Sequence, residues 1–138
     1  MNRLLFASMC LVLAACGGGE GGANMRPGEN CLSCHDGSNR EAPRFTVAGT
    51  VFSSNTAAAS AGLSGVTVII TDANGAETPL TTTAVGNFYT TKTIAAPYKA
   101  AVVRNGTRTS MSATPNGGCS SCHATPPVGG APGRLYAP

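Results

Sequence analysis

The chain has 138 residues, of which 11% are charged, and its formal net charge is +3. That charged fraction is well below the roughly 25% usual in soluble domains, and threonine, alanine, glycine and serine take its place. So small and scattered a charge argues against a nucleic-acid partner and gives no reason to expect an anionic membrane face. The length fits one small domain with appendages, so partners have to be inferred from sites.

The first fifteen residues have the features of an export signal. "MNRLLFASMCLVLAA" carries one basic residue near its start and an apolar stretch too short to span a bilayer. The sequence LAAC at 13–16 resembles the lipobox of bacterial lipoproteins, in which the cysteine, here Cys16, is acylated and becomes the mature N-terminus. Gly17 after it is typical of lipoproteins sent to the outer membrane. We therefore expect a lipid anchor in the outer membrane, on its periplasmic face or at the cell surface. An ordinary secretory signal is the alternative.

Two copies of one motif account for the four cysteines that remain in the mature chain besides the lipidated Cys16. CLSCH at 31–35 recurs as CSSCH at 119–123, and the two copies use both histidines. Cys-x-x-Cys-His is the attachment motif for c-type haem: two thiols add to the vinyl groups of one porphyrin edge, and the histidine is the proximal iron ligand. The sequence thus predicts two haem c groups. The predicted attachment residues are Cys31, Cys34, Cys119 and Cys122, and the predicted proximal ligands are His35 and His123.

Three other uses of these cysteines were weighed. Zinc sites also use Cys-x-x-Cys pairs, but an exported protein with a histidine directly after each pair favours haem. A thioredoxin-like redox pair needs a βαβ context, which the sequence lacks. Two local disulfides stay open as an alternative if the host lacks haem-attachment machinery.

The distal iron ligands are a separate question, because bis-histidine ligation of two haems needs four histidines. Met25 and Met111 each lie a few residues upstream of one motif, and a Met/His pair raises the reduction potential of a haem. Either methionine can serve its own haem or the other one. Lys92 and Lys99 are weaker candidates, and an open distal position is the remaining alternative.

Each motif is followed by an Ala-Pro pair and then an arginine and an aromatic residue. Arg44 and Arg134 are candidates for haem propionate contacts, because a guanidinium matches a carboxylate bidentately. Solvated loop arginines are the alternative reading. Phe45 and Tyr136 are candidates to cover haem edges, but Phe45 fits better as the first core residue of a strand, and Tyr89 is also expected in the core.

The stretch between the motifs reads as short antiparallel strands rich in threonine. Asn-Gly pairs at 74–75 and 105–106 predict hairpin turns. The expected strands lie within 45–52, 65–70, 77–83, 87–93, 98–104 and 107–111. We expect a mainly β chain, a small antiparallel sandwich of about six strands with a haem segment at each end of the sequence.

Gly49-Thr50-Val51, GVTVIITDANG and TTTAVGNFYT together resemble the carboxypeptidase regulatory-like group of β-sandwich domains, of immunoglobulin-like and prealbumin-like shape. The resemblance covers about half of the chain and implies a scaffold, without implying a function. A chain of the form motif, sandwich, motif also resembles small dihaem lipoprotein cytochromes.

The predicted organisation has five parts. They are a signal peptide at 1–15, a Gly-rich tether at 16–30, a first haem segment at 31–44, the sandwich at 45–111, and a second haem segment at 112–138. An even number of alternating strands brings the two haem segments to the same pole of the sandwich. An additional strand within 53–65 would separate them.

No catalytic constellation is recognisable, so the sequence predicts an electron carrier and not an enzyme. The expected partners are periplasmic or extracellular redox proteins, and assembly with other cytochromes is possible. Two alternatives stay open. One is a haem-based ligand-binding or sensing module with an open iron, and the other is a docking subunit of a larger extracellular electron-transfer complex or filament.

Overall fold

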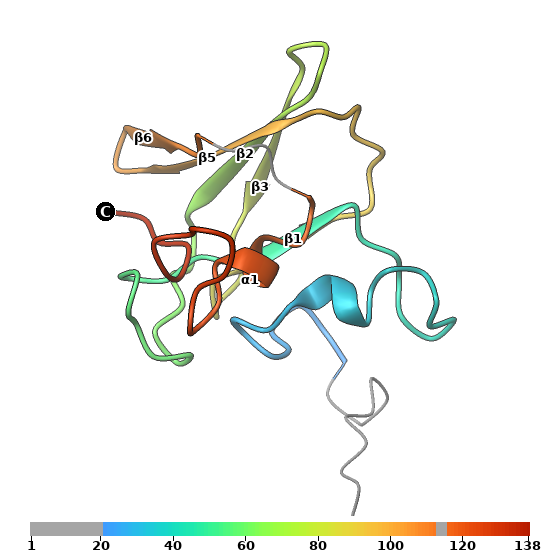
Figure 1. Ribbon diagram of the computed structural model, residues 1–138, viewed down its shortest axis with the longest axis horizontal. Helices are drawn as coiled ribbons and strands as arrows, with labels where there is room; N and C mark the ends of the chain where they lie inside the picture. The colour runs from blue at the N-terminus through green and yellow to red at the C-terminus, as the bar shows by residue number, and fades with distance from the viewer. Residues whose placement is uncertain (1–20, 113–115) are drawn as a thin grey trace, which may run out of the picture.

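The computed structural model describes residues 21–112 and 116–138, which form a mainly β structure (Figure 1). The signal peptide expected at 1–15 and the lipidation site expected at Cys16 lie outside the described residues. Within the described ranges, no helix is long and apolar enough to cross a membrane. In chain order the elements are the 3₁₀ turn η1 (Cys31–Ser33), β1 (Val47–Thr50), β2 (Thr67–Thr71), β3 (Glu77–Thr81), β4 (Asn87–Thr90), β5 (Lys99–Arg104), β6 (Thr107–Ser110) and the helical turn α1 (Cys119–Cys122).

The strands form where the sequence predicts them, although most are shorter. Along β2, Val68 and Ile70 are buried and their neighbours are half-buried, so one face of the strand lines the core. Asn105 and Gly106 join β5 to β6, and their φ angles of 49° and 79° suit the tight Asn-Gly hairpin turn. The other Asn-Gly pair, at 74–75, lies in the turn between the paired strands β2 and β3.

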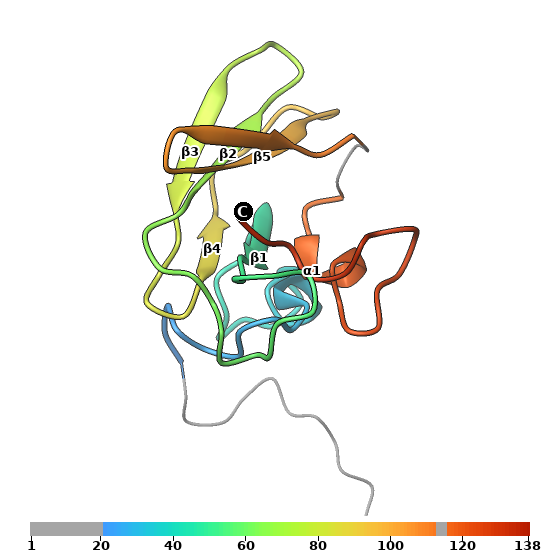
Figure 2. The same cartoon turned by 90° about the vertical axis from the view of Figure 1, so that its left-hand side faces the viewer.

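The strands form two antiparallel sheets, one with the order β3-β2-β5-β6 and one with β1-β4 (Figure 2). Val68, Ile70 and Val102 of the larger sheet join Val47 and Phe88 of the smaller sheet in one buried cluster. The two sheets therefore share a core. The predicted class, a small mainly β sandwich of six antiparallel strands, is confirmed.

Strand β1 forms hydrogen bonds along both of its edges, and one edge contacts the C-terminal part of the chain. One of its edges pairs with β4. On the other edge, the Ala48 amide nitrogen donates to the Gly117 carbonyl at 2.9 Å, and just beyond the strand Phe52 bridges to Tyr136. Ala137 is fully buried in the core. The C-terminal part of the second haem segment thus completes the sandwich and is not a separate loop.

Both motif segments pack against β1, and Figures 1 and 2 both show η1 beside α1. A side-chain carbon placed on Gly118 would lie 3.0 Å from Asn30 Oδ1, so the two segments touch directly. The segment 53–65, where an additional strand would have separated them, contains no strand. The expected side-by-side placement of the two motif segments is confirmed.

The close approach of α1 to β1 depends on Gly49. A methyl group there would lie 2.8 Å from Cys119 Cβ and 2.9 Å from Phe88 Cζ, which is closer than van der Waals contact permits. We expect Gly49→Ala to lower the free energy of unfolding in denaturant by about 1–3 kcal/mol through overpacking. Gly21→Ala is the control, because nothing lies within 4 Å of a methyl group at that position. Equal unfolding midpoints for the two variants would contradict the packing described here.

Candidate haem-binding site

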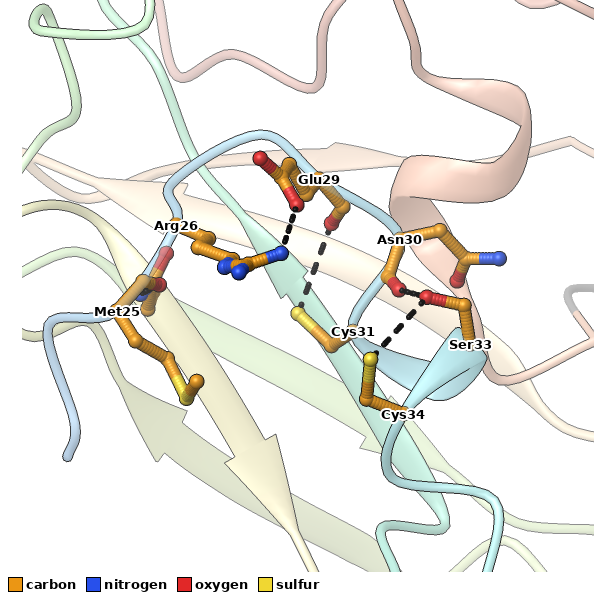
Figure 3. Close-up of polar contacts among 8 residues, drawn as sticks. Met25, Arg26, Glu29, Asn30, Cys31, Ser33 and Cys34 are labelled. Carbon is orange, nitrogen blue, oxygen red and sulfur yellow. Dashed lines mark hydrogen bonds and ion pairs between the residues drawn. The ribbon is translucent and has the colours of Figure 1, made fainter. Parts of the chain in front are cut away.

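The first motif forms a tight turn, and the side chains of Cys31, Cys34 and His35 line one cavity. The His35 amide nitrogen donates to the Cys31 carbonyl at 3.0 Å, which closes one helical turn over the motif. The Ser33 hydroxyl donates to the Asn30 carbonyl at 2.7 Å and fixes the start of that turn. Figure 3 shows the sulfur atoms of Cys31 and Cys34 directed toward the side on which the preceding loop, with Met25, lies.

The second motif repeats this geometry bond for bond. The His123 amide nitrogen donates to the Cys119 carbonyl at 3.0 Å, and the Ser121 hydroxyl donates to the Gly118 carbonyl at 2.6 Å. Serine stands directly before the second cysteine in both motifs, and this shared residue is a signal that motif spacing alone misses. The two segments are structurally equivalent over the motif.

Both histidine rings are held by their Nδ1 atoms. His35 Nδ1 lies 2.8 Å from the Pro43 carbonyl oxygen, and His123 Nδ1 lies 2.9 Å from the Gly133 carbonyl oxygen. A carbonyl only accepts, so each Nδ1 carries the proton and each Nε2 keeps its lone pair. A backbone carbonyl that holds the other ring nitrogen is the usual arrangement of a metal-ligating histidine.

The His35 ring lies at one end of an aromatic stack. It lies parallel to the Phe45 ring with centroids 4.1 Å apart, and Phe45 in turn stacks on Tyr89 at 4.6 Å. The sequence led us to expect Phe45 and Tyr89 in the core, and this expectation is wrong. Phe45 precedes β1, is half-buried and covers the histidine, and Tyr89 is 41% exposed and covers Phe45.

A cavity of about 410 Å³ opens beside the first motif, and its wall includes Met25, Cys31, Cys34 and His35. The described structure thus brings together one predicted distal ligand, one predicted proximal ligand and the two predicted attachment residues of the first motif. Phe45 and Tyr89 supply the aromatic part of the wall. The cavity wall combines a methionine, two cysteines and a histidine, which are the residue types that hold a His/Met-ligated haem c.

The loop that carries Met25 is bonded to the smaller sheet. The Asn87 side-chain amide donates to the Met25 carbonyl at 2.8 Å and to the Ala23 carbonyl at 3.2 Å. The Gly28 amide nitrogen donates to Thr50 Oγ1 at 2.9 Å. The flexible tether expected at 16–30 therefore does not extend past Ala23, because these bonds hold the following residues.

Met111 is not brought to the second motif by any contact among the described residues. Its amide nitrogen donates to the Ala100 carbonyl at 2.9 Å, which places Met111 directly after β6 at the end of the larger sheet. Lys92 is bonded through Nζ to Thr78 Oγ1, and Lys99 is exposed on β5. Within residues 21–112 and 116–138, only the first motif is thus seen with a candidate distal ligand.

The two predicted propionate contacts have different surroundings. Arg44 lies outside the Met25 cavity and lines a second cavity of about 520 Å³ together with Asp36. The guanidinium of Arg134 lies 4.3 Å from the centre of the Phe52 ring, and its Nε and Nη1 atoms are buried with no hydrogen-bond acceptor. Arg26, which sequence reasoning missed, lines the Met25 cavity and pairs with Glu29 at 3.4 Å. The Ala-Pro pattern that singled out Arg44 and Arg134 is absent around Arg26, so no sequence signal pointed to it.

The cysteines differ in their chemical state. Cys31, Cys119 and Cys122 are free thiols, whereas Cys34 is disulfide-bonded. Burial, reinforced by the nearby Cys31, raises the pKa of Cys119 to about 12. Burial also raises the pKa of Cys31 above its ordinary value.

The raised pKa of Cys119 predicts slow alkylation. The thiolate is the reactive form, so at pH 8 we expect Cys119 in the reduced, haem-free protein to react with iodoacetamide at least tenfold more slowly than it does in denaturant. The rate should keep rising toward pH 12 and not level off near 9, the ordinary value. Because the unfolded thiol ionises first, its contribution to stability is intact below pH 9 and is lost as the pH rises through 12. A folded-state rate equal to the denatured rate at pH 8 would contradict this environment.

Residues 21–112 and 116–138 contain no cluster of three or more His, Cys, Asp or Glu side chains suited to a metal ion. The sandwich is antiparallel and contains no βαβ unit, so the thioredoxin-like reading has no structural context.

No protein-family model, curated protein or solved structure matches this chain. The two resemblances named from the sequence therefore stay expectations, and function has to be argued from the site.

Proposed function

We propose that this protein is a lipid-anchored electron carrier with two covalently attached c-type haems. The observation that carries the proposal is the cavity shared by Met25, Cys31, Cys34 and His35. Such a haem supplies a reversible one-electron change between ferric and ferrous iron. Lipidation at Cys16 and location at the outer membrane belong to the same proposal and rest on the lipobox-like sequence.

The residues around the cavity fit a flat apolar group that carries carboxylates. Its volume of about 410 Å³ lies in the range of roughly 300–1,000 Å³ found for small-molecule sites. The stacked rings of Phe45 and Tyr89 supply an apolar wall next to His35. Arg26 lines the cavity, and a carboxylate is the acceptor that a guanidinium matches best.

Each residue has a definite role in this proposal. Cys31 and Cys34 hold the porphyrin edge: each S–H adds across a vinyl C=C, so that sulfur bonds one carbon and hydrogen goes to the other, with no net change in electron count. Because Cys34 is disulfide-bonded here, a thiol reductant must first supply two electrons to free it. His35 would hold the iron through Nε2 while the Pro43 carbonyl holds its Nδ1. Met25, in the wall of the same cavity, would hold the iron through its thioether sulfur.

The two motif segments touch, because a side-chain carbon on Gly118 would lie 3.0 Å from Asn30 Oδ1. This contact supports transfer of electrons between the two sites within one chain. The partners would be periplasmic or extracellular redox proteins, with assembly among other cytochromes as one form of partnership. The β-sandwich serves as a rigid platform for both motifs, whatever family it belongs to.

One observation favours a second candidate function, the binding of a small ligand at the second iron. Met111 is bonded to Ala100 at the end of the larger sheet, and no described contact joins it to His123. An iron with no protein group on its distal side would accept an added ligand. The two functions are compatible within one chain.

A redox titration with carbon monoxide tests the proposal. We expect the isolated protein to be reduced and re-oxidised reversibly in two one-electron steps. The reduced form should bind one carbon monoxide per chain, at the haem of the second motif. Binding of two per chain would contradict ligation by Met25, and failure to cycle would contradict electron transfer.

A further inference from the structure

Two buried polar side chains stand where the smaller sheet meets the Met25 loop. Thr50, the last residue of β1, and Asn87, the first residue of β4, are cross-strand partners. They are 1% and 5% exposed. The Thr50 hydroxyl donates to Asn87 Oδ1 at 2.8 Å, so each side chain fixes the other.

The other bonds of this pair all lead to the loop that carries Met25. Thr50 Oγ1 accepts from the Gly28 amide nitrogen at 2.9 Å. Asn87 Nδ2 donates to the carbonyls of Ala23 and Met25, at 3.2 and 2.8 Å. The two side chains thus hold the loop at both ends of a six-residue stretch.

Among the described residues, the loop has few other hydrogen bonds to the sandwich, although Gly28 also lies against the side chains of Arg134 and Phe52. Its described backbone hydrogen bonds run within the loop itself, from Met25 N to Gly22 O and from Glu29 N to Arg26 O. A buried polar pair costs desolvation free energy unless its groups are bonded, and here the bonded groups belong to the loop. The position of Met25 relative to the sheet therefore depends on Thr50 and Asn87.

The same sheet also locates His35. Phe45 stacks on Tyr89 of β4, and His35 stacks on Phe45. Residues of β4 thus fix both the proposed distal ligand, through Asn87, and the proposed proximal ligand, through Tyr89. Two positions of β4, separated by one residue, thus locate residues on both sides of the cavity.

We propose that Thr50 and Asn87 are positioning residues that set the place of the Met25 thioether opposite His35. This inference rests on the proposed haem function. It goes beyond that function because it assigns control of the iron ligand of the first haem, and hence of its reduction potential, to a buried hydrogen-bonded pair. The pair contacts Met25 only through the Met25 backbone carbonyl.

The test compares two buried threonines. Thr50→Val keeps the side-chain shape and removes the hydroxyl. Thr82→Val is the matched control: Thr82 is 4% exposed, and its hydroxyl accepts from Val66 N at 2.9 Å and donates to Leu63 O at 2.6 Å, away from the Met25 loop. We expect similar losses of thermal stability. Only Thr50→Val should weaken the Met-to-iron charge-transfer absorption and lower the midpoint potential of one haem. Thr50→Ser should restore both.

Asn87→Asp gives a second variant of nearly unchanged shape, which places a carboxylate against two carbonyl oxygens. We expect it to lose the same absorption. Full retention of the Met-to-iron absorption and of the potential in both Thr50→Val and Asn87→Asp would overturn the inference.

Hydrogen exchange of the isolated protein separates this inference from the proposed function. The Gly28 amide should exchange about tenfold faster in Thr50→Val and at the wild-type rate in Thr82→Val. If wild-type protein lacks the Met-to-iron absorption, the proposed ligation by Met25 fails, and faster exchange at Gly28 would still support anchoring of the loop. Unchanged exchange in Thr50→Val would overturn the anchoring itself.

Discussion

Replacing Met25 with alanine is expected to abolish the Met-to-iron charge-transfer absorption of the oxidised protein. Met25 lines the cavity of the first motif together with His35, and no other methionine of the described residues lines it. Loss of a thioether ligand also lowers the reduction potential, because Met/His ligation raises it. We expect the reduced Met25→Ala variant to bind carbon monoxide at both haems.

Met111→Ala is the control for this prediction. Met111 follows β6 and is bonded to Ala100 through its backbone, which alanine preserves. We expect the absorption and the carbon monoxide stoichiometry to stay at their wild-type values. The assignment of Met25 is wrong if the absorption survives in Met25→Ala and disappears in Met111→Ala.

Removal of both cysteines from one motif is expected to lower the mass of the protein by one haem. The effect on the free energy of unfolding should differ between the two motifs. No residue of η1 is buried, so Cys31→Ala with Cys34→Ala should leave the free energy of unfolding within about 1 kcal/mol of the reduced, haem-free parent, in which the disulfide of Cys34 is already open. Cys119 packs against the core, so Cys119→Ala with Cys122→Ala should lower it by about 1–3 kcal/mol.

The two double variants control for one another. Each should retain one haem, and only the variant of the first motif should lose the Met-to-iron absorption. Stability is compared in haem-free protein, so that loss of the cofactor does not enter the difference. Loss of both haems on removal of either motif would mean that the two sites do not assemble independently.

Local sequence patterns sufficed for the strands. Alternating apolar residues in β2 and the Asn-Gly turn at 105–106 are local signals, and each appears in the structure where it was expected. The side-by-side placement of the two motifs was also predicted from the strand count, because an even number of strands returns the chain to the end of the sandwich at which it began.

The features that the sequence did not predict depend on contacts between residues far apart in the chain. Phe45 and Tyr89 are apolar or aromatic residues of the kind that fill cores, yet Phe45 stacks on His35 and Tyr89 stacks on Phe45, and only the fold shows which apolar residues face a site. Thr50 and Asn87 lie in ordinary strand sequences, and their bonds cross 22 and 62 residues to reach Gly28 and Met25. Contacts of that range leave no local signal in a single sequence.

The same limit applies to the arginines and to the tether. Arg44 and Arg134 stand in similar sequence contexts, but Arg134 has buried nitrogens without acceptors, whereas Arg44 lies in a different cavity from Met25. The glycine-rich composition of 16–30 predicts flexibility, and two side chains of the sheet nevertheless hold residues 23–28. The composition of a segment does not reveal hydrogen bonds that other parts of the chain make to it.

The intact mass of the protein, measured under denaturing and reducing conditions after production in a host that attaches c-type haem, tests the central claim most directly. The account predicts the mass of the lipidated mature chain plus two haems, with thioether links at Cys31, Cys34, Cys119 and Cys122 found by peptide mapping. A mass equal to the polypeptide and lipid alone, with the four cysteines free after reduction, would contradict it.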